Sequence, residues 1–234
     1  MKIKHLLSLF IVFLSVNSAF SQEKKFKVHT IAFYNLENIF DTINDPDTYD
    51  EEYTPVNGWN TKNYKKKLDN LSRVLIELGT SDVQKNSPVI IGGCEIENRG
   101  VLEDLVKHPT LIDKGYKIVH FDSPDKRGID VGFLYQEKHF QPTSYINVPL
   151  YVYETEPKDA KKSKEEEEKE ENVNVDKKTK RIYTRDQLLV TGLLDGEEIN
   201  IIVNHWPSRS GGEKRSSPYR EAAGRLNRKI IDSI

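Results

Sequence analysis

The stretch that decides how this chain folds is Ser87-Pro88-Val89-Ile90-Ile91-Gly92-Gly93-Cys94-Glu95-Ile96-Glu97-Asn98. Residues 89–91 form a short apolar run after a proline, which is typical of a strand buried on both faces of a sheet. Glu95 follows where such a strand should end. A carboxylate there is costly to bury unless it is paired or binds a metal, and open α/β sheets hold ligands outside the carboxyl ends of their strands. Glu95 is therefore the first candidate metal ligand, with Glu97 as the competitor and a solvated loop carboxylate as the alternative.

The residues before this stretch predict a strand, a loop and a helix. Residues 27–35 alternate in polarity and predict a strand that ends at Asn35, with a turn over residues 36–41. Residues 41–58 are acidic and rich in turn formers, so we expect a surface loop. Residues 61–79 predict a helix that ends at Gly79. Its apolar stripe consists of Tyr64, Leu68, Leu71, Leu75 and Leu78.

The residues after it predict a second helix and then mostly hairpins. The second helix covers residues 100–107, and residues 116–121 and 129–135 form a hairpin. Further strands are expected at 143–153, 186–194 and 199–204. A last helix opens at residues 216–218, and its inner face consists of Ala222, Ala223, Leu226, Ile230 and Ile231. Strand–helix–strand units that give way to hairpins favour a mixed sheet with helices on its outer face.

Two segments lie outside this α/β pattern. Residues 1–21 resemble a secretory signal peptide, because Lys2 and Lys4 precede an apolar run that is too short to span a bilayer comfortably. We therefore expect one domain over residues 22–234, working in a secreted or periplasmic location without a stable membrane anchor. Residues 158–180 are a charged low-complexity insertion.

Charge and cysteine content exclude some classes of protein. The 234-residue chain has a formal net charge of −2, which becomes −4 once Lys2 and Lys4 are removed. Such a chain has no global basic field to hold nucleic acid by counterion release, so any polyanion must be held by a few arginines or a metal. The single cysteine, Cys94, rules out an intramolecular disulfide framework.

Three predicted strands end in polar groups that handle phosphate, namely Asn35, Glu95 and the Asn204-His205 pair. An amide orients a phosphate or a water, a carboxylate holds a hard divalent cation, and a histidine moves a proton. Together these groups are parts of metal-assisted phosphodiester cleavage. The alternatives are structural: Asn35 caps its turn, Asn204 satisfies backbone groups, and a lone histidine serves packing.

Five motifs that contain these residues resemble the endonuclease/exonuclease/phosphatase superfamily and follow its order across almost the whole chain. They are Tyr34-Asn35-Leu36-Glu37-Asn38, Cys94-Glu95-Ile96-Glu97-Asn98-Arg99, Arg127-Gly128-Ile129-Asp130-Val131-Gly132-Phe133-Leu134-Tyr135, Thr184-Arg185-Asp186 and Val203-Asn204-His205-Trp206-Pro207-Ser208-Arg209. The resemblance implies a partial four-layer α/β/β/α sandwich with mixed sheets and outer helices. It also implies hydrolysis of phosphodiesters with Mg²⁺, or Mn²⁺ in its place.

The resemblance assigns roles residue by residue. Glu95 matches the glutamate that binds the catalytic Mg²⁺, and Asn35 matches the amide beside the metal and phosphate. His205 matches the histidine that contacts the scissile phosphate, with Asn204 next to it as a substrate-binding residue. Asp130 lies near the acidic residue that orients this histidine. Arg185 resembles an arginine that contacts substrate phosphate.

The match also departs from the family pattern, because a Gly-Asp-x-Asn motif and a final Asp-His pair do not occur before Ile234. The chain resembles the first two-thirds of such an enzyme, and we expect this fragment to be inactive by itself. The expected function is that of a metal-dependent phosphodiester hydrolase acting on a nucleotide, a nucleic acid or another phosphodiester. The alternative is a non-catalytic surface or binding module that retains the fold. Nothing in the sequence indicates an oligomeric state.

Overall fold

The structure is a computed structural model that describes residues 26–154, 175–176 and 180–234. The predicted signal peptide at 1–21 and most of the predicted charged insertion at 158–180 lie outside these residues. The described elements are β1 (Ile31–Ile39), η1 (Glu51–Tyr53), η2 (Pro55–Asn57), α2 (Thr61–Glu77), β2 (Ile90–Ile96), α3 (Arg99–Val106), η3 (Ile112–Lys114), β3 (Tyr116–His120), β4 (Asp130–Gln136), β5 (Phe140–Val148), β6 (Val152–Tyr153), β7 (Val175–Asp176), β8 (Arg181–Ile182), β9 (Gln187–Leu194), β10 (Glu197–Val203) and α5 (Glu213–Ile231).

The strands form two main sheets and a small third one. The first sheet has the order β1-β2-β4-β3, in which β1 and β2 are parallel and the other pairs are antiparallel. The second sheet has the order β10-β9-β5 and is antiparallel throughout. The third, β6-β8-β7, extends from the end of the second sheet. The mixed α/β class predicted from the sequence is confirmed.

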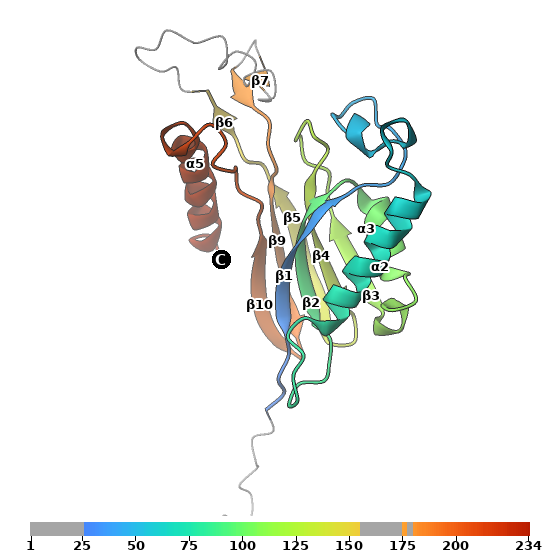
Figure 1. Ribbon diagram of the computed structural model, residues 1–234. Helices are drawn as coiled ribbons and strands as arrows, with labels where there is room; N and C mark the ends of the chain where they lie inside the picture. The colour runs from blue at the N-terminus through green and yellow to red at the C-terminus, as the bar shows by residue number, and fades with distance from the viewer. Residues whose placement is uncertain (1–25, 155–174, 177–179) are drawn as a thin grey trace, which may run out of the picture.

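The layers are helices, first sheet, second sheet and helix, as Figure 1 shows. One apolar cluster joins α2 and α3 to the first sheet, and a second fills the space between the two sheets. In β2, Ile91 belongs to the first cluster and its neighbour Ile90 to the second, because successive side chains of a strand point to opposite faces. β2 is therefore buried on both faces, as its continuous apolar run predicted.

Helix α2 forms where its sequence pattern placed it. The side chain of Asn60 caps its first turn by accepting hydrogen bonds from the backbone N–H groups of Lys62 and Asn63. Tyr64, Leu68, Leu71 and Leu75 form its buried face. The predicted end differs slightly: Leu78 is the C-terminal cap, and Gly79 follows with a φ of 67°.

Three predicted boundaries are wrong. β1 does not end at Asn35 but continues to Ile39 through an irregular segment in which Glu37 and Asn38 have positive φ. The strand expected at 143–153 begins earlier and is divided into β5 and β6. α5 begins at Glu213, so that Pro218 lies inside the helix, where it removes one backbone hydrogen bond.

Helix α5 lies beside the second sheet, on the side away from α2 and α3 (Figure 1). Gln187 at the start of β9 donates a hydrogen bond to the backbone oxygen of Ala223, which ties the helix to the sheet. Ala223 and Ile230 are buried as expected, but Ile231 is 45% exposed and does not belong to the inner face. In the described part of the chain, no helix combines the length and apolar character needed to cross a bilayer.

Candidate active site

Glu95 lies where the regular pairing of β2 breaks down. The register of β2 against β4 shifts between Cys94 and Ile96, and Glu95 has a φ of 61°. A non-glycine residue rarely adopts this left-handed conformation, and β-bulges commonly re-aim a side chain beside an active site. The Glu95 side chain is 19% exposed, in agreement with a carboxylate near the carboxyl end of a buried strand.

Asn35 approaches Glu95 from the neighbouring parallel strand. In the register of β1 and β2, Asn35 lies opposite Cys94, and its Nδ2 donates a hydrogen bond of 2.9 Å to Glu95 Oε1. Its Oδ1 accepts a hydrogen bond of 2.7 Å from the backbone N–H of Glu37, which holds the amide in this orientation. The irregular end of β1 therefore positions the amide that contacts Glu95.

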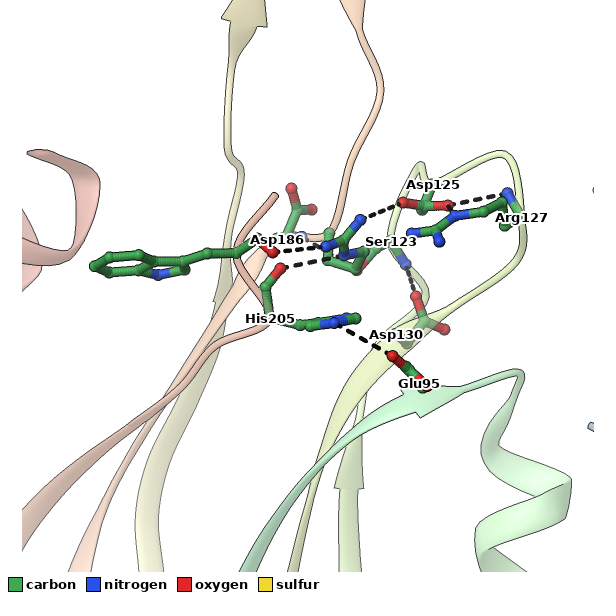
Figure 2. Close-up of polar contacts among 9 residues, drawn as sticks. Glu95, Ser123, Asp125, Arg127, Asp130, Asp186 and His205 are labelled. Atoms are coloured by element: carbon green, nitrogen blue, oxygen red, sulfur yellow. Dashed lines mark hydrogen bonds and ion pairs between the residues drawn. The ribbon is translucent and has the colours of Figure 1, made fainter. Parts of the chain in front are cut away.

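His205 reaches the same place from the second sheet. It follows the end of β10, and its Nε2 lies 3.6 Å from Glu95 Oε1, as Figure 2 shows. Three strands from two sheets thus bring an amide, a carboxylate and an imidazole together, although Asn35 lies within β1 rather than at its end.

The imidazole of His205 is held in its neutral form. Burial, followed by the positive charge of Arg185, lowers the pKa of His205 to about 4. Its Nδ1 is buried without a partner among the described residues. A neutral imidazole near neutral pH can accept a proton, or hand one on, at the nitrogen that faces Glu95.

Arg185 fixes the loop that carries His205. Its Nε and Nη2 donate hydrogen bonds to the backbone oxygens of His205 and Trp206, and its Nη1 lies 3.0 Å from Asp125 Oδ2. The Arg185 side chain is only 6% exposed. The sequence assigned Arg185 to direct phosphate contact, whereas the structure shows an arginine occupied in positioning the His205 loop.

Asp130 and Asn204 lie near the site with other partners. Asp130 Oδ1 accepts a hydrogen bond from the backbone N–H of Ser123, and its Oδ2 lies 3.1 Å from Nε2 of His120. The expected orientation of His205 by Asp130 stays a prediction, because the structure pairs this carboxylate with another histidine. Asn204 Nδ2 makes a long contact of 3.4 Å with the backbone oxygen of Ile202, and its Oδ1 is buried without a partner in the described residues.

Comparison with known proteins identifies the architecture that holds this site. The model of the endonuclease/exonuclease/phosphatase family matches residues 30–163 and 160–234, which together cover most of the chain. The chain belongs to the endonuclease/exonuclease/phosphatase family. No curated protein matches the sequence significantly.

Solved structures with related architecture include three at low sequence identity. An endonuclease/exonuclease/phosphatase from Bacteroides vulgatus is 13% identical with a TM-score of 0.46, over 86% of this chain and 59% of that one. A humanized D. rerio TDP2 is 10% identical with a TM-score of 0.43, over 86% of this chain and 54% of that one. The human Nocturnin catalytic domain is 15% identical with a TM-score of 0.37, over 62% of this chain and 47% of that one. The chain thus spans less than two thirds of the length of each.

The donor set of this endonuclease/exonuclease/phosphatase chain fits a hard divalent cation at Glu95. Mg²⁺ is usually held by one or two carboxylates together with waters and substrate phosphates, so Glu95 can supply one of its ligands but binds it only weakly when alone. Asn204 Oδ1 and His205 Nδ1, which are buried and have no partner among the described residues, are polar atoms of the kind that proteins normally satisfy with water, an ion or a ligand.

Glu97, the competing candidate ligand, lies in a separate environment. Its Oε2 accepts a hydrogen bond of 2.6 Å from the backbone N–H of Asp41, and burial raises its pKa to about 7. It lines a cavity of about 150 Å³ beside the acidic loop, together with Asp41 and Asp45. The structure therefore favours Glu95 over Glu97 as the residue that faces Asn35 and His205.

Asp125 is the residue of this site that sequence reasoning missed. The sequence predicted no role for the turn between the strands at 116–121 and 129–135, yet Asp125 in this turn is 4% exposed and forms the counter-charge of Arg185. Its Oδ1 also accepts a hydrogen bond of 2.9 Å from the backbone N–H of Arg127 (Figure 2). The one signal available was an aspartate in a turn next to a family motif, and that does not reveal a buried ion pair.

Proposed function

We propose that this chain is a divalent-metal-dependent phosphodiester hydrolase whose reaction centre is formed by Glu95, Asn35 and His205. Proteins of this family are hydrolases that act on phosphate esters and generally use divalent metal ions. The single observation that carries the proposal is the convergence of the three side chains from separate strands.

In this mechanism each residue has one task. Glu95, oriented by Asn35, would hold a Mg²⁺ or Mn²⁺ ion, which when bound polarises a phosphoryl oxygen and stabilises the charge that develops there. The neutral imidazole of His205 contacts the scissile phosphate and takes part in proton transfer at Nε2. Arg185 and Asp125 hold the backbone of His205, so that the ring is positioned before the substrate arrives. Water attacks the phosphorus in line with the ester oxygen that leaves: a P–O bond to the water forms as the P–O bond to the leaving oxygen breaks, and the proton lost by the water is matched by the one that the leaving alcohol gains. No covalent enzyme intermediate forms.

The net charge of the chain bears on the class of substrate. The chain has a net charge of −2 and no global basic field. We therefore propose a nucleotide, a short nucleic acid or another compact phosphodiester as substrate. The signal-like residues 1–21 support a substrate that is met outside the cytoplasm.

Because residues 1–234 are expected to be inactive by themselves, the test uses this chain joined to a segment that carries the family's Gly-Asp-x-Asn motif and Asp-His pair. It measures hydrolysis of bis-p-nitrophenyl phosphate by that chain with Mg²⁺ or Mn²⁺. Release of p-nitrophenolate should stop in EDTA and fall by about 100-fold or more in Glu95→Gln and His205→Gln. His108→Gln is the matched control, because His108 also faces a carboxylate, Asp69 at 2.9 Å, but lies in another part of the molecule. Hydrolysis that is unaffected by EDTA or by Glu95→Gln would refute the proposal.

One observation favours a second candidate, a module that binds phosphate esters without turnover. In the described part of the chain, Glu95 is the one carboxylate within 4 Å of His205, and a lone carboxylate fixes Mg²⁺ weakly. Metal-dependent binding of bis-p-nitrophenyl phosphate without release of p-nitrophenolate would establish this candidate instead.

A further inference from the structure

A second group of potential metal ligands lies at the other end of the sandwich. It consists of His29, His139 and Asp195, and each contributes one ligand atom within 4.8 Å of the other two. His29 lies two residues before β1, His139 directly before β5, and Asp195 in the turn between β9 and β10. Since Asn35 lies six residues beyond His29 along an extended strand, roughly 20 Å separates this group from the candidate active site.

The three side chains face one another around the Asp195 carboxylate. Asp195 Oδ2 lies 2.7 Å from His29 Nε2, and Asp195 Oδ1 lies 3.6 Å from His139 Nδ1. The two imidazole rings have centroids 4.8 Å apart at an interplanar angle of 51°. The backbone N–H of Asp195 also donates a hydrogen bond of 2.8 Å to the backbone oxygen of His139, which holds two of the three segments together.

The chemistry of this group matches a transition-metal ion better than Mg²⁺ or Ca²⁺. Two imidazoles and one carboxylate are a common ligand set for Zn²⁺, which leaves its fourth position to water. Ligand atoms of a tetrahedral zinc ion lie roughly 3.3 Å apart, so no pair here would have to approach by more than about 1.5 Å. The side chains of His29, His139 and Asp195 are 15%, 25% and 20% exposed, so an ion from solvent can reach them.

Asp195 also lies beside Lys27. Lys27 Nζ lies 3.0 Å from Oδ2, the oxygen that already faces His29, and the Lys27 side chain is 69% exposed. An incoming cation would therefore compete with a solvated lysine on one oxygen, while Oδ1 faces His139.

We infer that His29, His139 and Asp195 form a zinc-class metal site that joins the start of β1, the β4–β5 connection between the two sheets and the β9–β10 turn. The site cross-links the first sheet to the second at the end opposite the candidate active site. Its role is structural. β1 and β10 both begin near the metal site and run toward Asn35 and His205, so an ion there would fix the starting points of the two strands that carry these residues.

The test is a titration of the untagged full chain with Co²⁺, a spectroscopic substitute for Zn²⁺. One equivalent should give the visible absorption band of a tetrahedral Co²⁺ site, and Zn²⁺ should displace it. Asp195→Asn and His139→Gln should weaken Co²⁺ binding by about tenfold or more. Asp195 has a φ of 48°, a conformation that asparagine tolerates, so Asp195→Asn should fold normally.

Two controls separate this site from the rest of the molecule. His108→Gln removes a similar histidine–carboxylate pair, at 2.9 Å, which lies outside this group, and should leave the titration unchanged. Zn²⁺ should raise the melting temperature of the wild type and of His108→Gln, but not of Asp195→Asn, while circular dichroism without metal shows all three folded. A tetrahedral band that is absent from the wild type, or that persists in both Asp195→Asn and His139→Gln, would overturn the inference.

Discussion

Cys94 is next to Glu95 in β2, but its side chain lies in the core between the two sheets and is 2% exposed. Burial, and then the negative charge of Glu95, raises the pKa of Cys94 to about 12. Because the thiolate is the reactive form, the native thiol should resist an aromatic disulfide reagent at mildly alkaline pH and react fully in guanidinium. Rapid labelling of the native chain would contradict the position of Cys94 in the core.

The buried ion pair of Asp125 and Arg185 should be the most sensitive polar contact of the site. Asp125→Asn leaves the Arg185 guanidinium buried without its counter-charge, so the free energy of unfolding should fall by about 3–5 kcal/mol. Urea unfolding measures this change. The control is Glu221→Gln, which disrupts an exposed pair with Arg225 and should cost less than about 1 kcal/mol. Equal effects of the two substitutions would contradict the buried, positioning role of Arg185.

At the scale of single residues, the sequence predicted the side chains that stand at strand ends and failed where partners are distant. Asn35, Glu95 and His205 could be found because each lies where the regular part of a strand with a visible pattern stops. The pairing of Arg185 with Asp125 joins residues 60 positions apart, and the pairing of Asp130 with His120 depends on the register of β3 and β4. Such contacts have no local signal.

Alanine substitutions at two glycines test how individual elements pack. Gly192 in β9 lies against the first strand residues of β5, and a Cβ there would lie 2.4 Å from Phe140 Cζ and 2.6 Å from the backbone oxygen of Gln141. Gly192→Ala should therefore destabilise the chain by about 1–3 kcal/mol. In α5, a Cβ on Gly224 would meet Trp206 at 3.6 Å, an ordinary contact.

Gly224→Ala is the matched control, and it should stabilise the chain by about 0.5–1 kcal/mol because alanine favours a helix over glycine. Thermal unfolding measures whether each variant is less stable or more stable than the wild type. A stabilising Gly192→Ala would mean that β5 and β9 do not pack as described.

At the scale of elements, periodicity predicted the buried face of α2, the core strand β2 and both hairpins. The predicted boundaries of elements are wrong where the backbone geometry departs from what the polarity pattern indicates. β1 passes through positive φ values at Glu37 and Asn38 and resumes pairing at Ile39, which alternation of polarity cannot reveal. α5 accepts Pro218 in its second turn, so the proline did not mark the start of the helix.

At the scale of the whole molecule, the sequence predicted the class and the layers but not how the strands are ordered. The central position of β2 follows from its two-sided burial, whereas its neighbours β1 and β4 come from chain segments about 60 and 40 residues away. This order has a functional consequence. β1 and β2 are parallel neighbours, and β10 of the facing sheet ends next to His205, which lies 3.6 Å from Glu95. The two sheets together therefore create the site.

The most direct test of this convergence is the paramagnetic effect of Mn²⁺ on the NMR spectrum of the full chain. We expect substoichiometric Mn²⁺ to broaden the side-chain amide signals of Asn35 and the imidazole signals of His205 together, and Glu95→Gln to abolish both effects. Broadening that spares either residue, or that persists in Glu95→Gln, would show that the amide, the carboxylate and the imidazole do not share one metal-binding site.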